Sequence, residues 1–273
     1  MLKQKLEQFY ALISSWTKRI FNRILATLHQ SKVFLQQKIT SWWQIAVALT
    51  FAIVFLYYPI GGWMIHDIDT SSSYHPQNEN GKLSSVDMMS YLINREVHYK
   101  IWTPNLPFLF PSYFLDNMPS FQSGLISAVG KTALALDHLP LNAASETARI
   151  NLKEAAELLQ YPGNVWLFSP QNHLLPAPSS NTQYKKGRKK LNNFNNEVSA
   201  ARVIIDRSPQ NFGLILHFIR KDINRMIAKT ENHVRETNDA FTDFKADDVF
   251  YFDLGKLYAC LLYTSDAADD RIS

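Results

Sequence analysis

The sequence feature that most restricts the fold is an apolar run, residues 39–65, that contains no Asp, Glu, Lys, Arg or His. Its core, residues 45–65, would form an α-helix ~31 Å long, which matches the ~30 Å hydrocarbon layer of a bilayer. Aromatic rings at both margins are typical of spanning helices. We therefore predict one transmembrane anchor over residues 41–65, loosened or ended near Pro59 and Gly61–Gly62, with the anchoring aromatic residues Trp42, Trp43, Phe51, Phe55, Tyr57, Tyr58 and Trp63.

A soluble core helix and a cleaved signal peptide both fit this run less well. A buried core helix of this length rarely lacks charge and rarely has aromatic residues at both ends. A cleaved signal peptide has a shorter apolar region close to the N-terminus and a cleavage site of small residues. This run is longer, begins at residue 39 and lacks such a site.

Lysine and arginine are distributed unevenly about the anchor. Seven of them precede residue 44 against one acidic residue, whereas the first basic residue after the anchor is Lys82. Because loops rich in Lys and Arg stay in the cytoplasm, we expect a cytoplasmic N-terminus and an external chain from about residue 66. Basic and acidic residues balance over residues 45–259, so the basic pI comes from the N-terminal arm and does not indicate nucleic-acid binding.

The N-terminal arm, residues 1–40, combines positive charge with helical spacing of apolar residues. This pattern predicts an amphipathic helix with a basic opposite face. Three interpretations remain open: a helix lying on the anionic inner leaflet, a short coiled-coil seam for self-association, and an extension of the anchor without a partner. The apolar stripe consists of Leu2, Leu6, Phe9, Ile13, Trp16 and Ile20.

The chain beyond the anchor is expected to form a mainly α-helical external domain. Residues 66–83 are rich in Ser, Asn, Asp, Gly and Pro, which predicts a linker. Strand-like composition is confined to residues 165–168, and opposite charges favour antiparallel packing of the last two helices. We assign residues 84–259 to this domain, with helices expected over residues 84–99, 121–139, 146–161, 184–206 and 212–244.

The last stretch, residues 260–273, is set apart because its first ten residues, CLLYTSDAAD, resemble a translated reading frame of a transposase sequencing adapter. On this interpretation the stretch is not native, and the natural sequence is cut short after Ala259. Cys260 is the only cysteine of the chain, so we expect no disulfide and assign no redox or nucleophilic role to it.

No motif predicts a catalytic, cofactor-binding or metal site. Residues 124–132 resemble a phosphate-binding loop, but five residues separate the two glycines where the motif requires four. The spacing of His66, Asp67, Asp69 and His75 fits no helix, so a solvated loop accounts for them more simply than a metal site does. The basic run at residues 185–190 has two interpretations: it binds phosphates of lipid or polysaccharide, or, more simply, it is a solvated helix face.

Several strings resemble a family of bacterial inner-membrane proteins known as domain of unknown function 2333. They include WTPN at residues 102–105, LDNMP at 115–119, YPG at 161–163 and DDVFY at 247–251, and their order extends over residues 45–259. The resemblance implies a single-pass inner-membrane anchor and a mostly helical periplasmic domain. It implies no activity, cofactor or catalytic residue. The chain differs from the family pattern at Gln210, where the family has an acidic residue before the asparagine.

The candidate functional surface lies in the proline- and aromatic-rich segment, residues 102–119. Its prolines stop helix propagation, so we expect an irregular apolar segment that packs on helices or contacts a partner. Structural roles remain open as well: a turn at Asn105, a helix cap at Asp116 and a core anchor at Trp166. The predicted interaction surface comprises Trp102, Pro104, Asn105, Phe108, Phe110, Phe114, Asp116 and Asn117.

Two functional hypotheses follow. The first is a non-enzymatic envelope protein that contacts the bilayer through its anchor, and another envelope protein or a second copy of itself through this surface. The second is an enzyme or binding module for cell-wall or lipid material, with a site assembled only in the fold. A flat apolar face around residues 102–114 would favour the first. The second would be favoured by a pocket that brings together two or more of Glu96, His98, Asp116, Asp137, His138 and His173.

Overall fold

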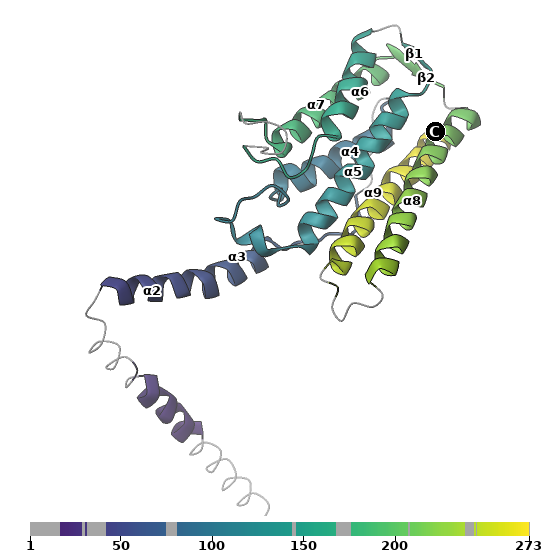
Figure 1. Cartoon of the computed structure of the whole chain (residues 1–273). Helices are drawn as coiled ribbons and strands as arrows, with labels where there is room; N and C mark the ends of the chain where they lie inside the picture. The colour runs from purple at the N-terminus through teal and green to yellow at the C-terminus, as the bar shows by residue number, and fades with distance from the viewer. Residues whose placement is uncertain are drawn as a thin grey trace, which may run out of the picture. The chain divides into compact units, whose positions relative to one another are not determined.

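The computed structural model of the chain describes residues 17–28, 31, 42–74, 81–143, 146–167, 176–206, 208–237, 243 and 245–272. These residues are mainly helical, which confirms the predicted fold class (Figure 1). The chain divides into two compact units, Met1–Leu56 and Tyr57–Ser273. In the arm, residues 17–28 form an exposed helix that includes Ile20, whereas the stripe positions from Leu2 to Trp16 lie outside the described residues.

A long apolar helix consists of α2 (Trp42–Ala52), the π-helical turn η1 (Ile53–Tyr57) and α3 (Tyr58–Ile65). Its portion Gln44–Ile65 is long and apolar enough to cross a membrane, and among the described residues it is the one such helix. The sequence left open whether Pro59 and Gly61–Gly62 loosen or end the helix. The structure shows a π-helical turn just before Pro59, and α3 continues past both glycines to Ile65. The wider π-turn directly before Pro59 makes room for a ring that would clash with the carbonyl four residues earlier.

The predicted anchor residues lie along this helix. Phe51, Phe55, Tyr57 and Trp63 are exposed, and Tyr58 is half-buried. The side chains of Trp42 and Trp43 lie outside the described part of the chain.

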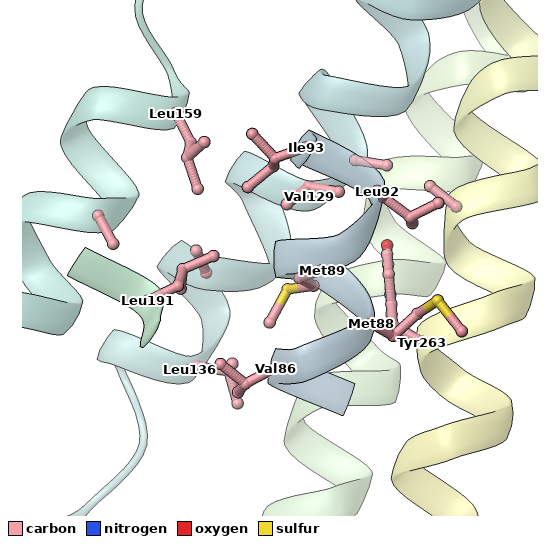
Figure 2. Close-up of a cluster of buried hydrophobic side chains, with 14 of the residues drawn as sticks. Val86, Met88, Met89, Leu92, Ile93, Val129, Leu136, Leu159, Leu191 and Tyr263 are labelled. Carbon is pink, nitrogen blue, oxygen red and sulfur yellow. The ribbon is translucent and has the colours of Figure 1, made fainter. Parts of the chain in front are cut away.

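The helix α4 (Ser84–Asn94) lies at the centre of the helical domain, because buried side chains cover more than one of its faces. Val86, Met89 and Ile93 are buried, as their spacing predicts, and the π-turn η2 (Arg95–Tyr99) extends the helix to the predicted end. Figure 2 shows the core where α4 meets side chains from α5, α6, α7 and α9, among them Val129, Leu136, Leu159, Leu191 and Tyr263.

Two reciprocal glycines bring α5 (Asn117–Asp137) and α9 (Ala246–Ile272) into close backbone contact. A Cβ atom at Gly124 would lie 1.9 Å from the carbonyl oxygen of Phe252, and one at Gly255 would lie 2.1 Å from that of Phe121. Since no side chain fits at either point, the glycines set the distance between the two helices. The helix α9 continues past Ala259 and buries Tyr263 in the core; this packing does not test the resemblance of residues 260–269 to an adapter.

A short antiparallel sheet joins β1 (Leu141–Ala143) to β2 (Val203–Ile205). Neither strand was expected, and the strand expected at residues 165–168 is wrong, because its described residues 165–167 are not extended strand. The stretch expected to be helical through residue 206 ends early, because α7 (Ser180–Ser199) is followed by Ala201 in the left-handed region, with φ 55°. This turn directs the chain into β2.

The antiparallel pairing that opposite charges predicted for the helices at residues 184–206 and 212–244 is also wrong. The helix α7 packs on α4 and on α6 (Glu146–Leu159), whereas α8 (Pro209–Thr237) packs on α5 and α9. Figure 1 shows α8 and α9 side by side. The basic face of α7 instead pairs with α6, where Lys190 Nζ lies 2.5 Å from Glu154 Oε2. Exposed pairs contribute only ~0–1 kcal/mol, which is too little to choose helix neighbours.

Candidate functional site

The first half of the predicted surface is part of the core. Trp102 is buried and its Nε1 donates a hydrogen bond to the Gly163 carbonyl oxygen at 2.9 Å. Asn105 is buried too, and its Nδ2 donates to the Val165 carbonyl oxygen at 2.9 Å. Pro104 between them is half-buried. These contacts fasten the segment to the loop after α6, so Trp102 and Asn105 hold the fold together rather than meet a partner.

The anchoring role expected of Trp166 therefore belongs to Trp102. The Trp166 side chain is 41% exposed, whereas its neighbour Val165 is buried. A tryptophan next to a Pro-Gly turn looks the same in sequence whether its ring points inward or outward, because a turn has no periodicity that assigns a face.

The second half of the surface is exposed and apolar, as predicted. It forms a turn closed by the Phe110 amide donating to the Pro107 carbonyl oxygen at 2.9 Å, followed by the 3₁₀ turn η3 (Pro111–Phe114). Leu109 and Tyr113 were not among the predicted residues, although the uncharged string FLFPSYF, in which Ser112 alone is not apolar or aromatic, was a signal for them. We call residues 108–114 the aromatic loop; its exposed side chains are those of Phe108, Leu109, Phe110, Tyr113 and Phe114.

The aromatic loop is bonded to the end of the apolar helix. Tyr57 Oη donates to the Leu109 carbonyl oxygen at 3.0 Å, and Tyr58 Oη donates to the Phe108 carbonyl oxygen at 2.6 Å. The ring centroids of Tyr58 and Phe114 lie 4.9 Å apart, edge to face. These two predicted anchor tyrosines thus meet three residues of the loop, a contact that no sequence pattern predicted.

Glycine allows this contact to be close. A Cβ atom on Gly61 would lie 2.5 Å from the ring of Pro111, so the ring occupies the space that a side chain at residue 61 would need. Gly61 therefore allows the loop to pack closely against α3.

The remaining two surface residues belong to a helix cap. Asp116 is the N-cap of α5, and one of its carboxylate oxygens accepts a hydrogen bond from the Asn117 amide at 2.9 Å. The capping role that the sequence left open is thus confirmed for Asp116, and Asn117 is the first residue of the helix.

A buried ionic cluster joins residues 69–71, which follow α3, to the helical domain. Arg95 Nε donates to Glu96 Oε1 at 2.7 Å, and Arg95 Nη1 donates to the hydroxyl of Tyr258 at 2.8 Å and reaches Asp69 Oδ2 at 3.4 Å. Burial would lower the pKa of Arg95, but the Glu96 carboxylate and Tyr258 raise it overall. Burial raises the pKa of Tyr258. Tyr258 also donates to the Ser71 carbonyl oxygen at 2.5 Å, so residues 69–71 are held against the core.

A second cluster ties together three helices. The Asp222 carboxylate of α8 pairs with Lys131 of α5 and lies 2.8 Å from Lys256 Nζ of α9. Burial raises the pKa of Asp222, but hydrogen bonds from both lysines lower it overall. Burial also lowers the pKa of Lys256. A cavity of about 130 Å³ adjoins this cluster and is lined by Thr132, Phe218 and Tyr263 among others.

Five of the six residues proposed for an acid–base site lie in the described structure, and they do not converge there. Glu96 is committed to Arg95, Asp116 caps α5, and His98 is exposed beside the ring of Tyr99. The ring of His138 stacks on Phe218 with centroids 5.9 Å apart, and its neighbour Asp137 is half-buried. His173 and the metal candidate His75 lie outside the described residues. Within the described part of the chain, no three His, Cys, Asp or Glu residues group as metal ligands.

One polar groove lies between α4, α7 and Tyr74, in the segment that follows α3. Its volume is about 390 Å³, and it is open to solvent. The rings of Tyr74 and Tyr91 stack at one side with centroids 3.7 Å apart, and Arg188 bonds to Asn94 within it. Other lining residues are Lys82, Asp87, Ser90, Asn192 and Asn196.

Comparisons with protein-family models, with curated proteins and with solved structures find no match to this chain. The resemblance to domain of unknown function 2333 therefore depends on the sequence strings alone and stays a prediction.

Proposed function

We propose that this chain is a single-pass protein of a bacterial inner membrane, with a cytoplasmic N-terminus and a periplasmic helical domain that has a structural or protein-interaction role. The observation that carries the proposal is the attachment of the apolar helix Gln44–Ile65 to that domain. Its last two turns, α3, belong to the same compact unit as the domain and are bonded to the aromatic loop. The basic residues before the anchor support the orientation.

The segment after α3, residues 66–74, supports the proposal that the domain is held at the membrane surface rather than tethered at a distance. Residues 66–74 were expected to be part of a free linker, but they contact the domain repeatedly. Lys100 Nζ lies 3.0 Å from Asp67 Oδ2, and Asp69 joins the Arg95 cluster. These contacts begin directly after Ile65, so the helical domain packs close to the end of α3 within one compact unit, which suits a protein that acts on partners at the membrane face.

The pairing of buried charges favours a structural role over catalysis. In the second cluster, Asp222 of α8 pairs with lysines of α5 and α9. In the first cluster, the sequence neighbours Arg95 and Glu96 pair with each other, and Arg95 also reaches Asp69. Catalytic groups instead converge on a cleft where a substrate has access. The clusters thus account for the buried charges without a reaction.

A second candidate function is a binding module for cell-wall material, and the polar groove favours it. Stacked tyrosine rings beside asparagine and arginine side chains offer the apolar face and the hydrogen-bond donors that a sugar needs. Titration of the chain with soluble peptidoglycan fragments tests it. Saturable binding that Arg188→Ala abolishes would establish this candidate function. The absence of binding at every fragment concentration would exclude it.

Reporter fusions test the first proposal. Alkaline phosphatase joined after residue 259 should be active in cells, and a fluorescent protein that matures only in the cytoplasm should be dark at the same position. Replacement of Arg23, Lys32 and Lys38, the basic residues nearest the anchor, by glutamine should weaken this bias, because positive charges close to an anchor set its orientation. A fluorescent C-terminal fusion with inactive phosphatase would contradict the proposal.

A further inference from the structure

We propose that the aromatic loop inserts its exposed side chains into the leaflet on the domain's side of the bilayer, beside the anchor, so that the partner of this surface is lipid. The inference rests on the proposed function, because it requires Gln44–Ile65 to span the membrane. It goes further by giving the surface an occupant and a depth.

The hydrogen bonds to the anchor set that depth. Tyr57 and Tyr58 precede the last residue of α3, Ile65, by eight and seven positions, which is ~10–12 Å along a helix axis. Their hydroxyls hold the carbonyl groups of Leu109 and Phe108. The loop backbone therefore lies beside the apolar helix, about two turns back from its end at Ile65. This depth is comparable with that of helices buried ~5–10 Å into the boundary between headgroups and acyl chains. A loop at this height cannot stay in water once the helix spans the bilayer.

The chemistry of the loop fits that environment. Residues 101–115 contain no charged side chain. Phe114 is 70% exposed, Leu109 63% and Phe108 62%, although these are side chains that burial stabilises. Exposed Ile60, Trp63 and Met64 of α3 add apolar surface of the same kind in the same compact unit.

Part of the loop backbone is hydrogen-bonded within the protein and needs no partner from the surrounding medium. Pro107 and Pro111 have no amide hydrogen to satisfy. Tyr113 and Leu115 donate their amides to the carbonyl oxygens of Phe110 and Ser112, at 3.0 Å each. The tyrosine hydroxyls of the anchor cover two more carbonyl groups. Internal hydrogen bonds of this kind lower the cost of moving irregular backbone out of water and into the membrane boundary.

Site-directed spin labelling of the full chain tests the inference. In a background with Cys260→Ser, single cysteines are introduced by Phe114→Cys in the loop, Phe51→Cys in the anchor and Ile204→Cys as control, and each is labelled with a nitroxide. Ile204 is exposed and apolar, and it lies on β2, which pairs with β1 near the C-terminal end of α5. The aromatic loop lies near the N-terminal end of this 21-residue helix, ~30 Å away. The chain is reconstituted in vesicles of phosphatidylethanolamine and phosphatidylglycerol, and relaxation by oxygen, which concentrates in lipid, is compared with relaxation by a water-soluble nickel complex.

The inference predicts that the labels at residues 51 and 114 both favour oxygen, while the label at 204 favours the nickel complex. A lipid-exposed label at 51 with a label at 114 as wet as that at 204 would overturn the inference and leave the anchor intact. A label at 114 shielded from both reagents would overturn it in favour of a protein contact. A wet label at 51 would refute the proposed function, and the inference with it.

Discussion

The close crossing of α5 and α9 predicts that one added methyl group destabilises the protein at Gly124 and stabilises it at Gly213. Both glycines lie inside helices, so Gly→Ala improves helix propensity by ~1 kcal/mol at either position. The surroundings differ. A Cβ atom at Gly124 would lie 1.9 Å from a backbone oxygen of Phe252, whereas a Cβ atom at Gly213 has nothing within 4 Å.

The expected magnitude at Gly124 follows from this distance. Cβ contacts under 3.0 Å essentially never occur, so α5 and α9 would have to separate by about 1.1 Å at the crossing. The opposing atom is backbone and cannot rotate away. Overpacking of this kind costs ~1–3 kcal/mol, and we expect the upper end, which leaves a net loss of ~2 kcal/mol after the propensity gain. For a domain of this size the melting temperature should fall by ~4–8 °C, and that of Gly213→Ala should rise by up to ~4 °C.

Thermal unfolding of the full chain in detergent, followed by far-ultraviolet circular dichroism, measures both variants against the unaltered protein. The pair is a matched control, because the chemical change is identical and only the space around it differs. If Gly124→Ala melted at or above the unaltered protein, the two helices could not be in the backbone contact described above.

Three further predictions concern the polar contacts. Asp222→Asn should lower stability at neutral pH by ~3 kcal/mol, because it removes the charge that two lysines face; since the folded pKa of Asp222 is below the ordinary 3.8, the stability that the carboxylate contributes is present above that value and is lost as the pH falls through the folded pKa, so denaturant titrations should show a flatter acid limb for the variant. Arg95→Met should cost ~3–5 kcal/mol in the same titrations by leaving Glu96 buried and unpaired, and Arg95→Lys should recover part of it. Asn105→Ala should cost ~1–3 kcal/mol by removing the bond to Val165, whereas Phe108→Ala in the exposed loop should leave domain stability in detergent within ~0.5 kcal/mol.

The sequence was informative where structure is encoded locally. The anchor helix was found because a run without charge is visible in any window. The helices α4, α5 and α6 were found because their apolar residues recur every three or four positions. The cap at Asp116 was found for a similar reason, since a cap uses only adjacent residues.

What the sequence could not supply is the choice of neighbours. The contact between Tyr58 and Phe108 joins residues 50 positions apart, and no local pattern distinguishes it from many alternatives. Helix pairing also failed, because surface charges are a weak guide, while the glycines that set the α5–α9 crossing are isolated residues without a period. The strands β1 and β2 were not predicted because three residues are too few to show an alternating pattern. The predicted surface includes both buried Trp102 and exposed Phe114, because prolines interrupt the periodicity that would have distinguished buried from exposed positions.

The central claim is that the apolar helix spans a membrane and leaves the helical domain on the outer side. Protease accessibility in spheroplasts tests it most directly, with a cleavage sequence inserted between the exposed residues Ser72 and Ser73 and a tag at the N-terminus. Protease added from outside should release the domain and leave a membrane-bound fragment that keeps the tag. An intact full-length chain in closed spheroplasts, cleaved only after the membrane is opened with detergent, would contradict the claim.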